Sequence, residues 1–425
     1  MPVLTALQGR FFHGWVVVSG AFFVSLVSFG VAYTFSTFFD ALKSQFDASR
    51  GDVSFVFALT GFIYFGLGAV SGPLADRIGP RRVIAAGIIC IGAGLLLASV
   101  AQSLWQVYLT YSLGVGFGVG FAYVPAIGAV QRWFVKRRGS ASGIAVTGIG
   151  IGTVAFPLIA DGLIAWQGWR GAYVSLAILS LAIGIPAALL VENSPERRGL
   201  NPHGAREDDA LHASALGGMA APQAMRTAPF WLMYIAAVLA GLGLFTPFVH
   251  LVPYAKDHGL SSTQGALLIA FIGIGSSVGR LFIGAPADRF GRKASLAAAY
   301  AAMAGSLFVW LGAQQFWSLS LFALLFGVSY GGFVALSPAL TTDFFGTKSA
   351  SGIIGWSFTG AAIGSLAGPT LAGFFYDATG SYTVPILFGA VANVAAAALI
   401  VFLASPEQYH AKNPPAAPAI VVESP

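Results

Sequence analysis

The chain has 425 residues, of which 56% are hydrophobic and only 9% are charged, and its formal net charge is +6. A soluble domain carries about 25% charged residues, so this composition excludes an ordinary soluble protein and predicts a protein that crosses the membrane many times. The positive charges lie in short segments between apolar runs, which argues against nucleic acid as a partner. The single cysteine, Cys90, rules out a disulfide within the chain.

Twelve apolar runs are each about 20 residues or longer, which is enough to cross a lipid bilayer as a helix. The first run is too long for the core of a signal peptide and has no clear cleavage site, so we expect it to stay as the first span. The sequence predicts spans at 14–39, 52–75, 82–100, 104–131, 139–163, 169–191, 229–256, 263–287, 293–313, 317–344, 349–376 and 382–404.

These spans divide the chain into two halves. We predict an all-α membrane protein with an N-terminal six-helix half at 1–191, a cytoplasmic linker at 192–228, a C-terminal six-helix half at 229–405 and a disordered tail at 406–425. With the N-terminus inside, the inner segments carry 17 of the 22 Lys and Arg residues. The positive-inside rule then predicts a multi-pass protein of the cell (inner) membrane with both termini in the cytoplasm.

Two sequence motifs occur once in each half. The segment Gly72–Arg82 (GPLADRIGPRR) matches Gly284–Lys293 (GAPADRFGRK), and the SASGI sequence of Ser140–Ile144 recurs at Ser349–Ile353. Two six-span halves related in this way are typical of a secondary transporter, whose binding site lies near the middle of the membrane between the halves.

The first of these motifs resembles the hallmark loop of the major facilitator superfamily. The resemblance extends to the twelve-span layout of nearly the whole chain, and it implies the fold of that superfamily. It also implies gate or scaffold roles for the loop, because its acid lies near a helix end and its basic residues can bridge to neighbouring helix termini. The residues concerned are Asp76, Arg77, Asp288 and Arg289.

A second resemblance is narrower. Trp133–Gly148 is similar to the fifth-helix motif of the monocarboxylate transporters and the related oxalate/formate antiporters, and His13–Val18 resembles part of their first-helix motif. Both groups have an arginine within the eighth helix, which Arg280 matches. The chain therefore resembles a bacterial monocarboxylate transporter homologue. It departs from the animal members in two places, since Ser276 stands where they have aspartate and residues 14–39 lack their lysine.

Arg280 interrupts an apolar run that has no other Asp, Glu, Lys or Arg between Asp257 and Asp288. An arginine in the middle of a membrane costs about 2.5–3.5 kcal/mol and cannot lose its proton, so it needs an anion or a water-filled cavity. Two interpretations remain open: Arg280 binds a substrate carboxylate, or it pairs with a protein acid such as Asp257. The oxalate antiporters add a lysine in helix eleven, whereas residues 349–376 contain no Lys or Arg. One buried cation suits one carboxylate, so we favour a small monocarboxylate such as lactate or pyruvate over oxalate.

Two titratable residues follow prolines near the outer end of span seven. Pro247 and Pro253 can break this helix and bring its outer part inward. We predict that Asp257 accepts a proton once a substrate reaches Arg280; the alternative is an ordinary loop acid. We predict that His250 bonds the substrate or relays a proton; the alternative is a core histidine bonded to a backbone carbonyl.

Four aromatic residues are further candidates for the substrate site. Tyr330 lies among glycines in span ten, and its hydroxyl is predicted to bind a lactate oxygen. An apolar wall for a methyl group is predicted from Tyr123, Phe333 and Phe358. Plain packing remains the alternative for each of the four.

Motifs of other chemistry do not occur in the sequence. It has no metal-ligand spacing and no phosphate-binding loop, so we predict neither an enzyme nor a bound cofactor or metal. We predict a proton-coupled secondary transporter of small monocarboxylates that works as a monomer, with the substrate, protons and the lipid bilayer as its partners. Two alternatives remain open: an organic-anion exchanger of the oxalate/formate type without net proton movement, and a membrane sensor of organic acids that does not transport them.

Overall fold

The computed structural model describes residues 12–134, 138–201, 219–283, 287, 289–346 and 350–412. One predicted gate residue, Asp288, lies outside these ranges. So do residues 413–425 of the predicted tail.

Eleven helices in these ranges are long and apolar enough to cross a membrane. The number is one below the twelve predicted spans because α8 (Arg138–Leu190) runs through both span five and span six. Its backbone leaves the helical region at Gly168, whose φ is 71°, a conformation that glycine adopts without steric cost. The all-α architecture of twelve spans is therefore confirmed.

In the N-terminal half, two predicted spans are interrupted helices. Span one breaks at Thr34, and span four contains a π-helical turn at Tyr108–Ser112. The helices of this half are α2 (Gly14–Tyr33), α3 (Phe35–Phe46), α4 (Arg50–Ile78), α5 (Pro80–Ser99), α6 (Leu104–Val107), α7 (Leu113–Trp133) and α8.

In the C-terminal half, span seven is broken, as its prolines predicted. The break lies at Phe245, and Pro247 occupies the first turn of the helix that follows. The long helices of this half are α11 (Ala228–Leu244), α12 (Thr246–Asp257), α13 (Ser262–Phe282), α15 (Arg292–Gly312), α16 (Phe316–Phe345), α17 (Ala350–Thr379) and α18 (Thr383–Phe402).

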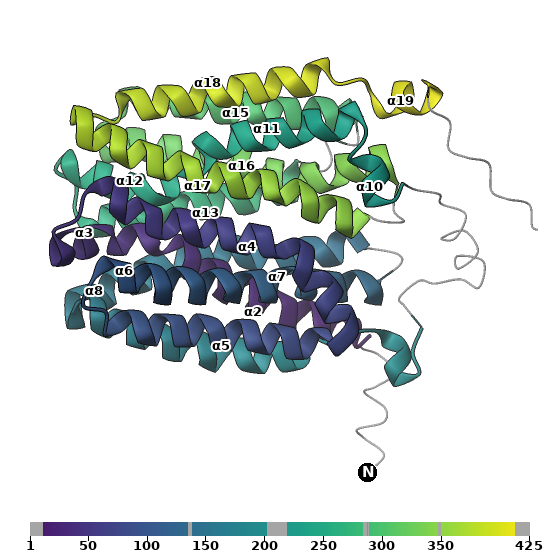
Figure 1. The fold of residues 1–425 in the computed structure, drawn as a ribbon, viewed down its shortest axis with the longest axis horizontal. Helices are drawn as coiled ribbons and strands as arrows, with labels where there is room; N and C mark the ends of the chain where they lie inside the picture. The colour runs from purple at the N-terminus through teal and green to yellow at the C-terminus, as the bar shows by residue number, and fades with distance from the viewer. Residues whose placement is uncertain are drawn as a thin grey trace, which may run out of the picture.

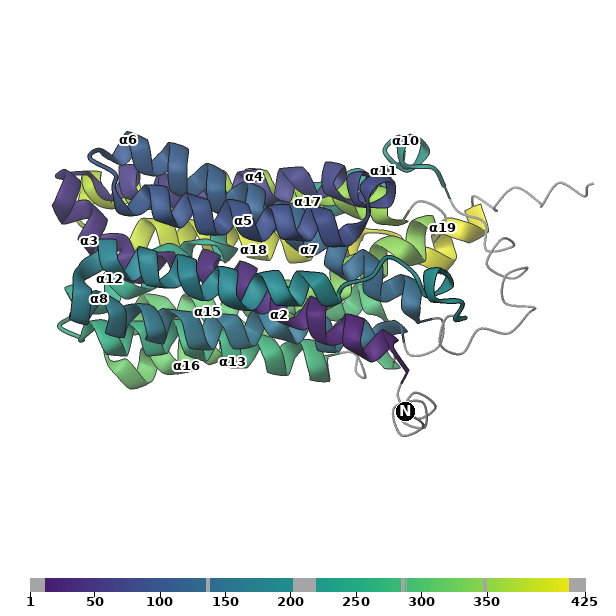
Figure 2. The same ribbon diagram turned by 90° about the horizontal axis from the view of Figure 1, so that it is seen from below.

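The long helices lie side by side along one axis, and the start of α2 and α19 (Pro406–Lys412) lie at the same end (Figures 1 and 2). We call this the terminal end, and we call the opposite end, with Asp47–Ser49 and Gly380–Tyr382, the distal end. The helix α19 differs from the predicted disordered tail. It is held by the Tyr409 ring, which packs on Phe344, and by His410, whose Nε2 bonds the Asp343 carbonyl.

The apolar core has two parts. The larger cluster contains side chains of the N-terminal half together with distal side chains of the C-terminal half, such as Phe248 and Trp310. The smaller cluster, with Phe230, Tyr300 and Phe344, lies at the terminal end of the C-terminal half alone. The two halves thus share a core at the distal end and have separate cores at the terminal end.

The repeated loop motif contains a glycine with a positive φ angle in each half. Gly79 (φ 93°) precedes α5 and Gly291 (φ 87°) precedes α15. Each allows the chain to leave one helix and start the next within one residue, because a positive φ is disfavoured for residues with a Cβ. In the described parts of the two motifs, this glycine therefore has the same positive φ in both halves.

Substitution of Gly148 by alanine should destabilise the N-terminal half. A Cβ there would meet the backbone carbonyl oxygen of Phe22 on α2, which cannot move without shifting the helix. Overpacking of this kind costs about 1–3 kcal/mol. The Gly148→Ala protein should therefore unfold several degrees lower in detergent. Gly162→Ala on the same helix, where nothing lies within 4 Å, should unfold at the wild-type temperature or above. Equal effects of the two substitutions would contradict this packing.

Candidate functional site

Arg280, in the last turn of α13, contacts the other half of the protein. Its Nη1 donates to the carbonyl oxygen of Val146 on α8 at 3.1 Å. The same two helices approach closely two turns before Arg280, where a Cβ on Gly273 would lie 2.7 Å from the Gly150 carbonyl oxygen. The Arg280 charge therefore lies at the seam between the halves, where the sequence predicted a binding site.

Two nitrogens of the same guanidinium have no hydrogen-bond partner. Nε and Nη2 of Arg280 are buried, and no acceptor in the described ranges reaches them. The Ser276 hydroxyl, one turn earlier on α13, is also buried and unpaired. Buried charged donors need an acceptor, so the Nε–Nη2 edge fits a ligand with paired oxygens such as a carboxylate.

Tyr330 on α16 lies next to this guanidinium. The Arg280 Cζ is 5.6 Å from the centre of the Tyr330 ring. The Tyr330 hydroxyl is 2.8 Å from the hydroxyl of Tyr33, at the end of α2. The structure thus brings together Arg280 and Tyr330 as the sequence predicted, and it adds Tyr33. Sequence reasoning missed Tyr33, because a tyrosine in an apolar span is usually ordinary packing.

Aromatic side chains of the N-terminal half form a wall near this point. Phe29 on α2 contacts Tyr33, Tyr64 and Tyr123, with ring centres 5.6, 5.8 and 5.0 Å away. A cavity of about 20 Å³ lies against the wall and is closed from the other half by Phe358. Tyr123 and Phe358 therefore share one small space between the halves.

The fourth predicted aromatic residue, Phe333, has a different neighbour. Its ring packs 5.5 Å from Tyr300 on α15, within the C-terminal half. This contact matches the packing alternative stated for Phe333.

His250 is completely buried and hydrogen-bonded at both ring nitrogens. Nδ1 is 2.9 Å from the Tyr382 hydroxyl, and Nε2 is 2.9 Å from the carbonyl oxygen of Pro369. A carbonyl only accepts, so Nε2 carries the proton and Nδ1 accepts from Tyr382. These contacts match the alternative of a core histidine bonded to a backbone carbonyl. The structure places His250 with Tyr382 and not with Arg280.

Asp257 pairs with Arg50, across the two halves. The Arg50 Nη2 lies 2.7 Å from Oδ1 of Asp257, and its Nη1 donates to the Tyr382 hydroxyl at 2.7 Å. Its Cζ lies 4.0 Å above the Tyr376 ring. The alternative stated for Arg280, a pairing with Asp257, is not seen in this conformation. The sequence did not single out Arg50, which reads as an ordinary loop cation before span two.

Further polar contacts close the distal end around this pair. The Asp377 carboxylate accepts from the backbone N–H groups of Arg50 and Gly51, at 3.0 and 2.8 Å. Lys256 pairs with Asp40 at 2.7 Å. We call the side chains of Arg50, Asp257, Tyr382 and Asp377 the distal lock, since each joins one half of the protein to the other or holds a residue that does.

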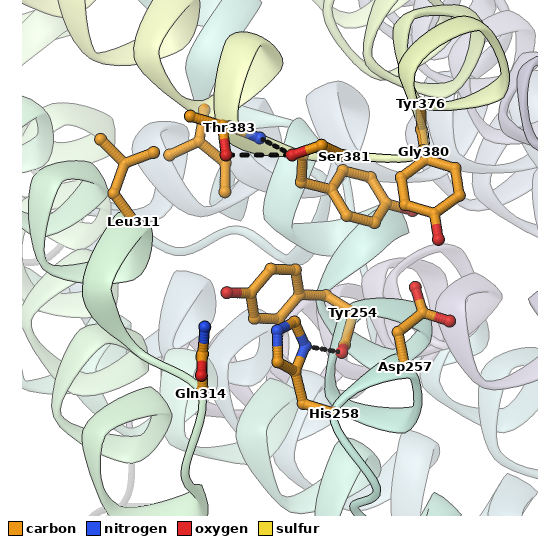
Figure 3. Close-up of a pocket in the computed structure, with 11 residues that line it drawn as sticks. Tyr254, Asp257, His258, Leu311, Gln314, Tyr376, Gly380, Ser381 and Thr383 are labelled. Carbon is orange, nitrogen blue, oxygen red and sulfur yellow. Dashed lines mark hydrogen bonds between the residues drawn. The ribbon is translucent and has the colours of Figure 1, made fainter.

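A pocket of about 340 Å³ opens beside the distal lock (Figure 3). Figure 3 shows Tyr254, Asp257 and Tyr376 directed toward this space. The Asp257 side chain is 30% exposed, whereas that of Arg50 is 9% exposed. A proton can therefore reach the carboxylate from the distal side without passing through the protein.

At the terminal end, the described ion pairs that involve the repeated loops stay within one half. Glu192 pairs with Arg81 and Arg198, and the Arg198 guanidinium holds the pKa of Glu192 below its usual range. Arg292 pairs with Asp343. Of the predicted gate residues, Arg77 and Arg289 are exposed, and Asp76 lies in the last turns of α4. In the ranges that the structure describes, no group of three or more His, Cys, Asp or Glu residues is arranged to hold a metal ion.

Comparisons with known proteins agree with this architecture. The sequence profile described as Major Facilitator Superfamily matches residues 21–310 and 252–423. The chain belongs to this superfamily, in its monocarboxylate transporter-like family. It is 31% identical over 398 residues to Monocarboxylate transporter 13 of Rattus norvegicus, which covers 92% of this chain and 89% of the relative. It is 30% identical over 384 residues to Monocarboxylate transporter 11 of Homo sapiens, covering 88% and 79%. These are membrane transporters, so the prediction of a multi-pass transport protein is confirmed at the level of the family.

Loss of the Asp257 charge should open the distal end of this family member. Asp257→Asn keeps the shape of the side chain but removes the partner of the Arg50 charge, so the closed conformation loses stability. A cysteine at Ser54, which is fully buried beneath the lock, reports this opening. In a Cys90→Ser background, Ser54→Cys should react about tenfold faster with a membrane-impermeant maleimide when Asp257→Asn is added, as expected for a loss of about 1.4 kcal/mol.

The matched control is Asp47→Asn, which removes an exposed carboxylate at the same end. It should leave the labelling rate of Ser54→Cys unchanged. An unchanged rate in the Asp257→Asn protein would show that the ion pair does not hold the distal end closed.

Proposed function

We propose that this protein is a proton-coupled transporter of small monocarboxylates such as L-lactate or pyruvate. The observation that carries the proposal is the buried Nε–Nη2 edge of Arg280, which lies between the halves and has no acceptor in the described ranges. A carboxylate fits this edge with two parallel hydrogen bonds. The relatives named as monocarboxylate transporters support the same class of substrate.

In this conformation the distal end is closed, and the two halves have separate apolar cores at the terminal end. The halves are held together by the distal lock, so access to Arg280 is favoured from the terminal end. Transport then requires the lock to open and the halves to rock about the seam beside Arg280. With the termini in the cytoplasm, as the positive-inside rule predicts, the distal end faces outward.

Asp257 is the group that we propose for proton coupling, through Arg50. The ion pair needs the ionised carboxylate, so protonation of Asp257 from the distal side favours the open lock. Closure restores the pair only after the proton has left. Net symport requires this proton to leave Asp257 toward the terminal end, so that it crosses the membrane in the same direction as the substrate.

Arg280→Gln should abolish uptake of labelled lactate into proteoliposomes, because the amide keeps hydrogen-bonding groups but carries no charge for the carboxylate. Arg280→Lys should retain a small part of the uptake, since a lysine supplies the charge without the bidentate edge. Arg170→Gln serves as a control, because Arg170 bonds the Ala101 carbonyl far from this site. Lactate uptake by Arg280→Gln at the wild-type rate would exclude Arg280 as the carboxylate site.

Asp257→Asn should remove the dependence of net uptake on the proton gradient while leaving exchange of labelled for unlabelled lactate. An amide cannot carry the proton, whereas Arg280 still binds the substrate. The measurement compares net uptake, counterflow and acidification of the lumen in the same vesicles. Wild-type counterflow without any acidification would instead favour the organic-anion exchanger. Binding without either flux would favour a sensor.

A further inference from the structure

The residues that hold Arg50 in the distal lock also line an open pocket. We propose that this pocket binds a small organic cation with a guanidinium group, which takes the place of Arg50 when the distal end is open. The site is formed by the side chains of Asp257, Tyr376 and Tyr382, which we call the cation cage. A cation bound there would keep the two halves apart at the distal end. This inference goes beyond the proposed function, because it concerns a second ligand and a second site.

The guanidinium of Arg50 shows what the cation cage binds. Its Nη2 lies 2.7 Å from the Asp257 carboxylate, and its Nη1 donates to the Tyr382 hydroxyl at 2.7 Å. Its Cζ lies 4.0 Å from the centre of the Tyr376 ring and 5.5 Å from that of the Tyr382 ring. A carboxylate combined with aromatic faces is typical of sites that recognise organic cations. The cage is therefore a guanidinium site that one residue of the chain occupies in this conformation.

The cation cage belongs to the C-terminal half, whereas Arg50 begins α4 of the N-terminal half. Contacts within the C-terminal half hold the cage tyrosines in place. The Tyr382 hydroxyl bonds Nδ1 of His250, and the Tyr376 and Tyr382 ring centres are 4.4 Å apart. When the halves part, Arg50 leaves with its own half and these contacts remain. The open conformation thus has a formed cage whose carboxylate has lost its cation.

The pocket beside the distal lock has room for the rest of a small molecule (Figure 3). All three cage residues line it, and its volume of about 340 Å³ is within the range of small-ligand sites. The Tyr254 ring, 5.7 Å from the Tyr382 ring, continues the aromatic surface into the pocket, and Leu311 and Ile386 add apolar surface. In the described part of the chain, no lysine or arginine lines this pocket. It therefore favours a cation with a short apolar tail over an anion.

A ligand of the vacated cage acts by mass action, because it binds the open conformation and Arg50 excludes it from the closed one. One charge pair with aromatic contacts corresponds to a Kd of about 5 mM. While the open conformation is a minor one, about 50 mM ligand should then raise its population about tenfold.

The test uses the Ser54→Cys protein in the Cys90→Ser background, whose labelling by an impermeant maleimide reports the open distal end. With about 50 mM n-butylguanidinium chloride, labelling should be about tenfold faster than in sodium chloride of equal concentration. Equal ionic strength keeps the screening of the Arg50–Asp257 pair the same. n-Butylurea, which has nearly the same shape but no charge, should leave the rate unchanged. An unchanged rate with butylguanidinium, or an equal rise with butylurea, would overturn the proposal.

Gln314→Trp is the matched variant. Gln314 is exposed and lines the pocket, but it is not a residue of the distal lock. A tryptophan there should fill the space for the tail, so butylguanidinium should no longer speed the labelling, while the rate without ligand stays at the wild-type value. A rise that persists in Gln314→Trp would refute this site. If Asp257→Asn speeds the labelling and butylguanidinium does not, the cation site is refuted and the distal lock stands. No monocarboxylate is present in these measurements, so neither result affects the proposed function.

Discussion

A positive charge that cannot be discharged lies in an apolar helix, and the structure around it follows from that constraint. Arg280 must find acceptors or a polar cavity, because the guanidinium keeps its proton under all physiological conditions. One of its nitrogens is satisfied by the carbonyl of Val146 in the other half of the protein. The charge therefore belongs to neither half alone. Any movement of the halves changes the environment of Arg280, which gives a bound anion the means to affect the conformation.

The distal lock contains a second buried arginine, whose charge is stabilised differently from that of Arg280. The Arg50 side chain is almost fully buried, but its charge is paired. Its partners are the Asp257 carboxylate, the Tyr382 hydroxyl and the Tyr376 ring. An arginine satisfied in this way stabilises one conformation. An arginine with an open edge, such as Arg280, is available to a ligand. The two arginines therefore differ in whether the described part of the protein satisfies their charge.

The sequence predicted the elements far better than the contacts. Twelve apolar runs, the broken seventh span and an arginine within the eighth span follow from hydropathy, proline and charge, which act locally. The partner of Asp257 could not be predicted, because Arg50 lies 207 residues away in the sequence and is brought to it only by the fold. The same holds for Tyr33 and Tyr330. His250 was placed correctly in the apolar span, but its two saturated ring nitrogens depend on α17 and α18, which no local pattern reveals.

The start of α4 is completed by the opposite half of the protein. Ser49 and Asp52 form a capping box at this end, and Asp377 accepts the N–H groups of Arg50 and Gly51 in addition. The first amides of a helix have no partner within the helix itself. When the halves part at the distal end, these two amides lose their acceptor and the first turn of α4 frays. Exchange of their hydrogens with solvent would then record each opening of the transporter, without any label or substrate.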